Sequence, residues 1–98
     1  MSKQLWIDDL RTPPDGWDWA KTSEEAIEML AVAAFNDDPY EEVSFDHDLG
    51  GEDTTRPVVI WMCSVGVFPP ICHVHTANPP GRIWLEGMIN HYGPGVIR

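Results

Sequence analysis

The chain has 98 residues and a formal net charge of −10 at pH 7, because 16 Asp and Glu outnumber 6 Lys and Arg. A chain of this length forms at most one domain, so we expect residues 1–98 to be a single folded unit. The cationic residues are scattered, which excludes general binding to nucleic acid polymers and disfavours anionic membrane surfaces. Hydrophobic residues make up 43% of the chain and include five Trp, which predicts a folded core.

The sequence has none of the patterns of a targeting or membrane-spanning segment. No apolar signal core follows residues 1–4. No apolar stretch approaches the roughly 20 residues needed to cross a bilayer. We therefore expect a cytoplasmic protein, in which Cys63 and Cys72, each among apolar neighbours, are buried reduced thiols.

The first half of the chain predicts two strands and a helix. Gln4–Asp8 is short, apolar and β-prone, and Trp17–Lys21 alternates large apolar with polar residues, as a second short strand would. The loop residues 9–16 separate them. Thr22–Glu25 has the spacing of a capping box and begins a helix that Asn36–Pro39 ends. The apolar stripe of this helix consists of Ala26, Ile27, Leu30, Ala33 and Ala34.

The second half repeats a strand and a helix twice. Glu42–Asp46 and Ile71–His75 are predicted strands. Arg56–Val65 is apolar nearly all round, which predicts a helix covered on most sides. Asn78–Pro79 is a good start for a last helix, which ends before Gly93. We expect the buried side of this helix to carry Ile83, Trp84, Met88 and Tyr92.

Strands that alternate with helices along the chain predict an α/β fold. Connections between parallel strands are almost always right-handed and usually contain a helix. We therefore expect a small, mainly parallel sheet of about four strands, flanked by about three helices on its faces.

Polar side chains follow three of the predicted strands. In open parallel sheets, ligands bind beyond the carboxyl ends of the strands. We therefore expect one site at this edge. The residues that would meet there are Asp8, Asp9, Asp46, His47, Asp48, His73, His75, Thr76 and Asn78.

Carboxylates gathered at one edge repel one another unless a cation lies between them. We therefore expect a divalent metal ion, held by Asp8, Asp9, Asp46 and Asp48. Carboxylate oxygens suit Mg²⁺ or Mn²⁺ best, and imidazole ligands beside them would also admit Zn²⁺. Each pair of acids, taken alone, is equally typical of a turn or a helix cap.

The histidines and arginines near this edge suggest phosphate chemistry. His73 and His75 are two residues apart on a strand, so they share a face and could move a proton. His47 could bind the metal or transfer a proton. Arg11 and Arg82 are candidates for binding phosphate, because a guanidinium pairs with two phosphate oxygens.

Three motifs give the chain a family resemblance. Leu5–Arg11, Ser44–Gly50 and His73–Asn78, in this order and spacing, resemble the cyclic-phosphate processing receiver-like domain family over nearly the whole chain. Members look like shortened response-regulator receivers and are often phage-encoded. The resemblance implies a small receiver-like, flavodoxin-like fold and action on cyclic phosphates or related nucleotides. In the last motif, either His73 or His75 matches the histidine of the family.

Three functions are compatible with these residues. The first is a metal-assisted phosphoesterase that processes a cyclic phosphate or small cyclic nucleotide, with Arg11, Thr76 and Asn78 orienting the phosphate. The second is a binding module that sequesters a nucleotide messenger or a host protein without turnover. The third is a phospho-receiver with Asp46 as acceptor, although residues 93–98 contain no Lys and are too short for the last strand of a receiver.

Overall fold

The computed structural model describes residues 3–97, so Met1, Ser2 and Arg98 of the predicted domain lie outside the described residues. The predicted receiver-like α/β fold is confirmed: four strands and three helices follow one another in the expected order. The strands are β1 (Gln4–Ile7), β2 (Asp18–Ala20), β3 (Glu42–Phe45) and β4 (Ile71–Val74), and the helices are α1 (Ser23–Phe35), α2 (Arg56–Val65) and α3 (Pro79–Tyr92).

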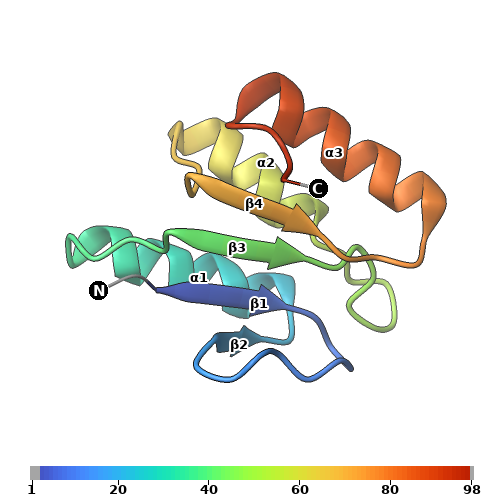
Figure 1. Cartoon of the computed structure of the whole chain (residues 1–98), viewed down its shortest axis with the longest axis horizontal. Coiled ribbons are helices and arrows are strands. Elements are labelled where there is room, and N and C mark those ends of the chain that lie inside the picture. The colour runs from blue at the N-terminus through green and yellow to red at the C-terminus, as the bar shows by residue number, and fades with distance from the viewer. Residues whose placement is uncertain (1–2, 98) are drawn as a thin grey trace.

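All four strands are parallel and lie side by side in the order β2-β1-β3-β4 (Figure 1). The register aligns Ile7 of β1 with Phe45 of β3, and Phe45 with Val74 of β4. The carboxyl ends of β1, β3 and β4 therefore meet at one edge of the sheet, which we call the carboxyl edge.

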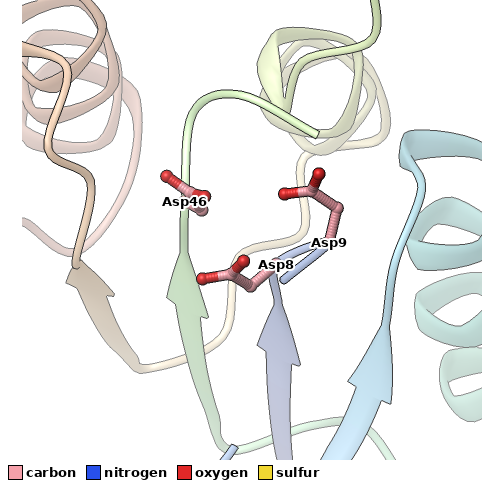
Figure 2. A group of neighbouring side chains, drawn as sticks. All are labelled: Asp8, Asp9 and Asp46. Carbon is pink, nitrogen blue, oxygen red and sulfur yellow. The ribbon is translucent and has the colours of Figure 1, made fainter. Parts of the chain in front are cut away.

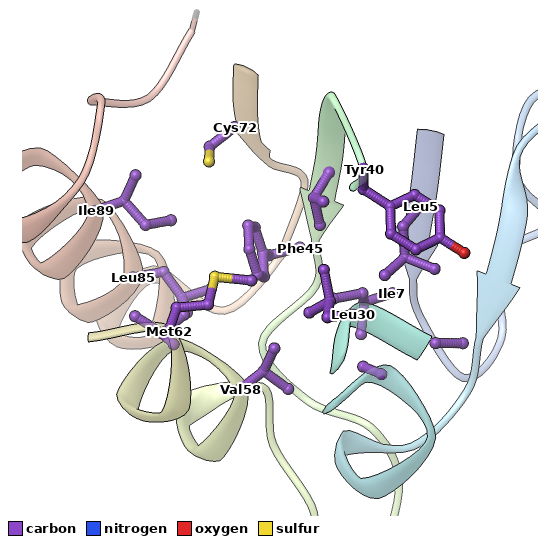
Figure 3. Packing of buried hydrophobic residues seen from close by; sticks show 14 of the residues in the cluster. Leu5, Ile7, Leu30, Tyr40, Phe45, Val58, Met62, Cys72, Leu85 and Ile89 are labelled. Atoms are coloured by element: carbon purple, nitrogen blue, oxygen red, sulfur yellow. The ribbon is translucent and has the colours of Figure 1, made fainter. Parts of the chain in front are cut away.

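The core lies on one face of the sheet. Leu5, Val43 and Cys72 are in register, and all three are fully buried, as are Ile7 and Phe45. Figure 3 shows the labelled strand residues, from Leu5 to Cys72, packed against residues of α1, α2 and α3, such as Leu30, Met62 and Leu85. The expectation of helices on both faces is therefore wrong. The other face, which we call the open face, carries none of the helices formed by residues 3–97.

The direction of the crossovers explains this one-sided arrangement. The connections through α1 and α2 both move across the sheet toward β4, and right-handed crossovers in one direction place their helices on the same face. The connection from β1 to β2 moves the opposite way, so its helix would lie on the open face. Residues 8–17 make this connection as a loop.

The start of α1 confirms the predicted cap residue Thr22 but only one of the two bonds of a capping box, because the Glu25 side chain accepts from the Lys21 N–H and not from the Thr22 N–H. The Glu25 N–H donates to Thr22 Oγ1 at 3.1 Å, and the Lys21 N–H donates to Glu25 Oε1 at 2.9 Å. The buried face of α1 is narrower than the predicted stripe, because Ala34 is exposed and Ile27 is half-buried. None of the helices within residues 3–97 is long and apolar enough to cross a membrane.

The expectation for α2 is wrong, and the one for α3 is right for two of its four residues. In α2, Ile60 is 53% exposed, because the three helices form an outer layer with solvent behind it. In α3, Ile83 is 73% and Tyr92 60% exposed, whereas Trp84 and Met88 are half-buried against the core, as predicted. The deepest apolar positions of α3 are four residues apart, at Gly81, Leu85 and Ile89, and the first of them packs against the β3 loop.

The end of the chain and the cysteines complete the fold. After α3, Val96 forms a single parallel bridge with Cys72 of β4, and the Ile97 N–H donates to the Cys72 carbonyl at 2.9 Å. Cys72 is buried, as predicted, and burial raises the pKa of its thiol to about 12. Cys63 is only half-buried, and both thiols are free.

Tyr40 provides a test of this packing. Its buried phenol donates to Asp18 Oδ2 at 2.6 Å. Burial, and to a smaller extent the hydrogen bond to the Asp18 carboxylate, raise the pKa of Tyr40 above the usual 10.0. Above about pH 10 the unfolded chain releases this proton while the folded chain retains it, so stability falls as pH rises. We expect Tyr40→Phe to cost about 0.5–1.5 kcal/mol at pH 7 and to reduce this alkaline decline, measured by urea unfolding. Identical pH dependence in both proteins would contradict the expectation.

Candidate functional site

The end of β1 and the end of β3 bring three acids together. Asp8 and Asp9 directly follow β1, and Asp46 directly follows β3, where its N–H donates to the Ile7 carbonyl at 2.9 Å. One oxygen of each carboxylate lies within 4.8 Å of the others (Figure 2). We call these three residues the acidic group. The acidic group lies between β1 and β3, where the order of the strands reverses: β2 is added on one side of β1, and β3 on the other. Ligands of open parallel sheets usually bind at this position.

Asp8 is the buried member of the acidic group, with 1% of its surface exposed. Its Oδ1 accepts from the N–H groups of Leu10 and Arg11 at 2.9 and 3.0 Å, and its Oδ2 lies 3.0 Å from His75 Nε2. Burial raises the pKa of Asp8, but these three donors lower it by more, so the pKa lies below its usual value. Asp8 is therefore a carboxylate at neutral pH, with a fixed orientation.

Asp9 and Asp46 are half-buried, and among residues 3–97 neither forms a salt bridge. Asp46 Oδ1 accepts from the His47 N–H at 2.8 Å, which leaves its other oxygen available. A Cβ at Gly50 would lie 3.0 Å from Asp9 Oδ2, and Gly50 has a φ of +87°, so glycine keeps this space open. Three close carboxylates without a cationic side chain between them fit a divalent metal ion.

Asp48, predicted as a fourth metal ligand, lies outside the acidic group. Its Oδ2 accepts from Asn78 Nδ2 at 2.9 Å, and its Oδ1 lies 3.0 Å from His47 Nδ1. The bonds from Asn78 and His47 lower the pKa of Asp48. Its carboxylate thus connects the loop after β3 to the start of α3.

His47 is buried among structural partners. Arg56 Nε donates to His47 Nε2 at 2.9 Å, so the ring proton lies on Nδ1 and is donated to Asp48. Both ring nitrogens are therefore occupied, which leaves none for a metal. The ring lies directly against Gly81: a Cβ there would be 2.4 Å from His47 Cγ. Arg56 also stacks over Trp84 at 4.8 Å, so His47 connects the loop to both α2 and α3.

His73 and His75 project from the open face, as their spacing predicted, but they have different partners. His73 Nε2 lies 2.6 Å from Glu42 Oε2, at the amino end of β3 and away from the acidic group. His75 Nε2 contacts Asp8, and its Nδ1 lies 2.6 Å from Ser44 Oγ. Only His75 therefore reaches the acids. The sequence could not decide which of the two histidines lies at the site, because residues two apart on a strand share a face.

A shallow cleft of about 440 Å³ opens at the carboxyl edge. Two members of the acidic group line it, and so do three of the four residues predicted to bind phosphate. The lining residues are Asp9, Leu10, Arg11, Asp46, Asp48, Gly50, Thr76, Ala77 and Asn78. Neither His73 nor His75 is among them.

The residues predicted to bind phosphate differ in how many of their side-chain polar atoms already have hydrogen-bond partners. Arg11 is exposed and donates from Nη1 to the His75 carbonyl. Asn78 caps α3 by accepting from the Gly81 N–H at 3.1 Å. Arg82 lies outside the cleft lining, where it donates to the Thr76 carbonyl at 2.8 Å and pairs with Glu86, so it holds the loop between β4 and α3.

Sequence reasoning missed Ser44 and Arg56. Ser44 lies between two buried apolar residues of β3, and this alternation indicated a polar side chain on the opposite face. Its contact with His75 depends on the pairing of β3 with β4, which no local pattern shows. No local pattern shows the contact of Arg56 either, because its partner His47 lies nine residues earlier in the chain.

The comparison with known families agrees with this geometry. The model of the cyclic-phosphate processing receiver domain matches residues 3–91. The chain belongs to this family. The matched range contains the acidic group and the whole cleft lining, so the fold and the association with cyclic-phosphate processing apply to this part of the chain. No curated protein matches the sequence.

The close approach of α3 to His47 generates a prediction. Gly81→Ala places a methyl group within 2.8 Å of three side-chain carbons of His47, namely Cβ and the ring atoms Cγ and Cδ2, so the ring must move and lose its partners. We expect a loss of about 1–3 kcal/mol in thermal or urea unfolding. Gly87→Ala is the matched control in the same helix, where a Cβ meets nothing within 4 Å, and it should stabilise the protein by about 0.5–1 kcal/mol. Equal effects of the two substitutions would contradict this packing.

Proposed function

We propose that the protein is a metal-dependent phosphoesterase that opens a cyclic phosphate or small cyclic nucleotide at the carboxyl edge. The acidic group carries this proposal: three carboxylates within 4.8 Å of one another lie beside an open cleft. Membership of the cyclic-phosphate processing receiver family supports the class of substrate.

The acidic group would hold the metal ion. Asp9 and Asp46 have free oxygens facing the cleft, while Asp8, which His75 and two N–H groups hold from behind, completes the set. All three donors are carboxylates, which favours Mg²⁺ or Mn²⁺ over Zn²⁺. A bound divalent ion would offset the charge of the phosphate and make water more acidic.

The cleft walls would bind the phosphate. Arg11 is exposed and belongs to the loop after β1, so its remaining guanidinium donors can reach an anion in the cleft. The Thr76 hydroxyl accepts from the Asn78 N–H at 3.1 Å and can donate its own proton to a phosphate oxygen. Asn78, already bonded to Asp48 and Gly81, shapes the wall.

Proton transfer would fall to a group that lines the cleft. Asp9 can hold the metal with one oxygen and accept a proton from an attacking water with the other. His75, predicted as the acid or base, would act through Asp8, because both of its ring nitrogens are engaged behind the acidic group. The role of His75 would be to keep the Asp8 carboxylate ionised and in a fixed orientation.

Metal binding is the first test. We expect Mn²⁺ to bind at one site in calorimetric titration, and Asp46→Asn to weaken its affinity at least about tenfold. Without metal, Asp46→Asn should unfold at the same or a higher temperature, because it removes repulsion within the acidic group. The control is Asp37→Asn, which makes the same charge change at an exposed position with a φ of 57°, a conformation that Asn tolerates. Equal Mn²⁺ affinities for the two variants would contradict the site.

Turnover is the second test. The protein is incubated with nucleoside 2′,3′- and 3′,5′-cyclic monophosphates and cyclic dinucleotides, with Mg²⁺ or Mn²⁺, and products are separated by chromatography. We expect ring opening of at least one substrate, a loss of about 100-fold or more in Asp46→Asn, and no loss in Asp37→Asn. Stoichiometric recovery of unchanged ligand would favour the binding module instead. Acid-labile phosphorylation of Asp46 by a small phosphodonor would favour the phospho-receiver.

A further inference from the structure

The loop after β1 places an exposed leucine in the wall of the cleft. Leu10 lies between Asp9 of the acidic group and Arg11, and all three residues line the cleft. The Leu10 side chain is 81% exposed and takes no part in the hydrophobic core. A single exposed leucine is ordinary on a protein surface. Leu10 differs because it stands between a proposed metal ligand and a proposed phosphate-binding residue, so a ligand held by both neighbours lies next to it.

The backbone that carries Leu10 is fixed. The N–H groups of Leu10 and Arg11 donate to Asp8 Oδ1 at 2.9 and 3.0 Å. The Arg11 carbonyl accepts from Trp6 Nε1 at 2.8 Å. The leucine side chain is therefore held at the cleft by its backbone and not by packing in the core. A preformed loop of this kind loses little conformational entropy when a ligand binds, so the exposed side chain is available for a ligand contact.

The cleft combines charged and apolar walls. Asp9, Asp46 and Arg11 form its charged part, and Leu10 and the exposed Ala77, which follows β4, have apolar side chains. A ligand that uses both parts has an anionic group and, directly attached to it, an apolar surface. A nucleoside cyclic monophosphate has this combination, because its phosphate is linked through the ribose to a flat base. Small-molecule sites typically pair apolar side chains with a few placed polar groups.

Two other phosphate ligands fit these walls less well. A cyclic phosphate without a base would contact only the charged part and would leave Leu10 in water. A lipid phosphate carries a long acyl chain, which needs more apolar wall than Leu10 and Ala77 provide. The cleft volume of about 440 Å³ lies within the range of about 300–1,000 Å³ that is usual for small-molecule sites.

We propose that Leu10 is a specificity-determining residue, which packs against the base of a nucleoside cyclic monophosphate whose phosphate lies beside the acidic group. The position of the phosphate rests on the proposed function. The contact with the base requires binding only and does not depend on turnover.

The experiment compares ligands with and without a base. The protein is titrated calorimetrically, in the presence of Mn²⁺, with adenosine 2′,3′- and 3′,5′-cyclic monophosphate and with glycerol 1,2-cyclic phosphate, which has no base. We expect at least one adenosine compound to bind about tenfold or more tightly than the glycerol compound, because only the base covers the leucine. Where turnover occurs, the same difference should appear in KM and not in kcat.

Variants of Leu10 test the contact itself. Leu10→Ala should weaken binding of the adenosine compound about fivefold or more and leave the glycerol compound unchanged, because it removes most of the apolar surface at this position. Leu10→Met keeps the apolar volume and should bind within about twofold of the wild type. Both variants should fold normally, since Leu10 lies outside the core.

Ile83→Ala is the matched control, because it removes an aliphatic side chain that is 73% exposed and lies outside the cleft lining. It should change neither affinity. Equal weakening of both kinds of ligand in Leu10→Ala would overturn the proposal, as would equal affinities of the wild type for them or no binding of either adenosine compound. Leu10-dependent binding without turnover would support the base contact while the proposed phosphoesterase fails. Turnover of both kinds of ligand with equal KM would have the opposite meaning.

Discussion

Parallel pairing of β1 with β3 is the constraint on which the rest of the site depends. In-register parallel strands end at the same edge, and this pairing places the residues after Ile7 beside those after Phe45. Asp8, Asp9 and Asp46 are brought together by this register and not by any attraction between them, since like charges repel. The hydrogen bonds of β1 to β3, and the core beneath them, therefore stabilise an arrangement that is unfavourable by itself. A divalent cation between these carboxylates would offset their repulsion.

The one-sided packing of the sheet makes the site chemically different from a sheet covered by helices on both faces. Strands buried on both faces are usually apolar throughout. Here the open face carries Trp6, Ser44 and His75, which a helix-covered face would not accommodate. The loop 8–17, short and without a helix, contributes both Arg11 to the cleft and Trp17, which packs edge-on against Trp6. The missing helix thus provides room for the hydrogen bonds that join Ser44, His75 and Asp8.

The residues around the cleft divide into two sets. Asp48, His47 and Asn78 satisfy one another and hold the loop after β3 against the start of α3. Their polar atoms are committed to structure, which is why the Asp-His-Asp motif supplies only one member of the acidic group. Asp9 and Arg11, by contrast, keep free polar atoms at the surface of the cleft. A rigid wall beside a few free groups is the arrangement that a small charged ligand requires.

The sequence by itself determined the order and type of all seven elements, because apolar periodicity, the helix cap at Thr22 and the Pro and Gly punctuation act over a few residues. It also placed Asp8, Asp9 and Asp46 at one edge, since strand ends in a parallel sheet must meet. Only the tertiary structure decided that His75 and not His73 reaches the acids, that Asp48 and His47 brace α3, and that Ser44 bonds to His75. The physical reason is the same in each case: these contacts join residues on different strands or helices, and their geometry depends on register and on which face the helices cover.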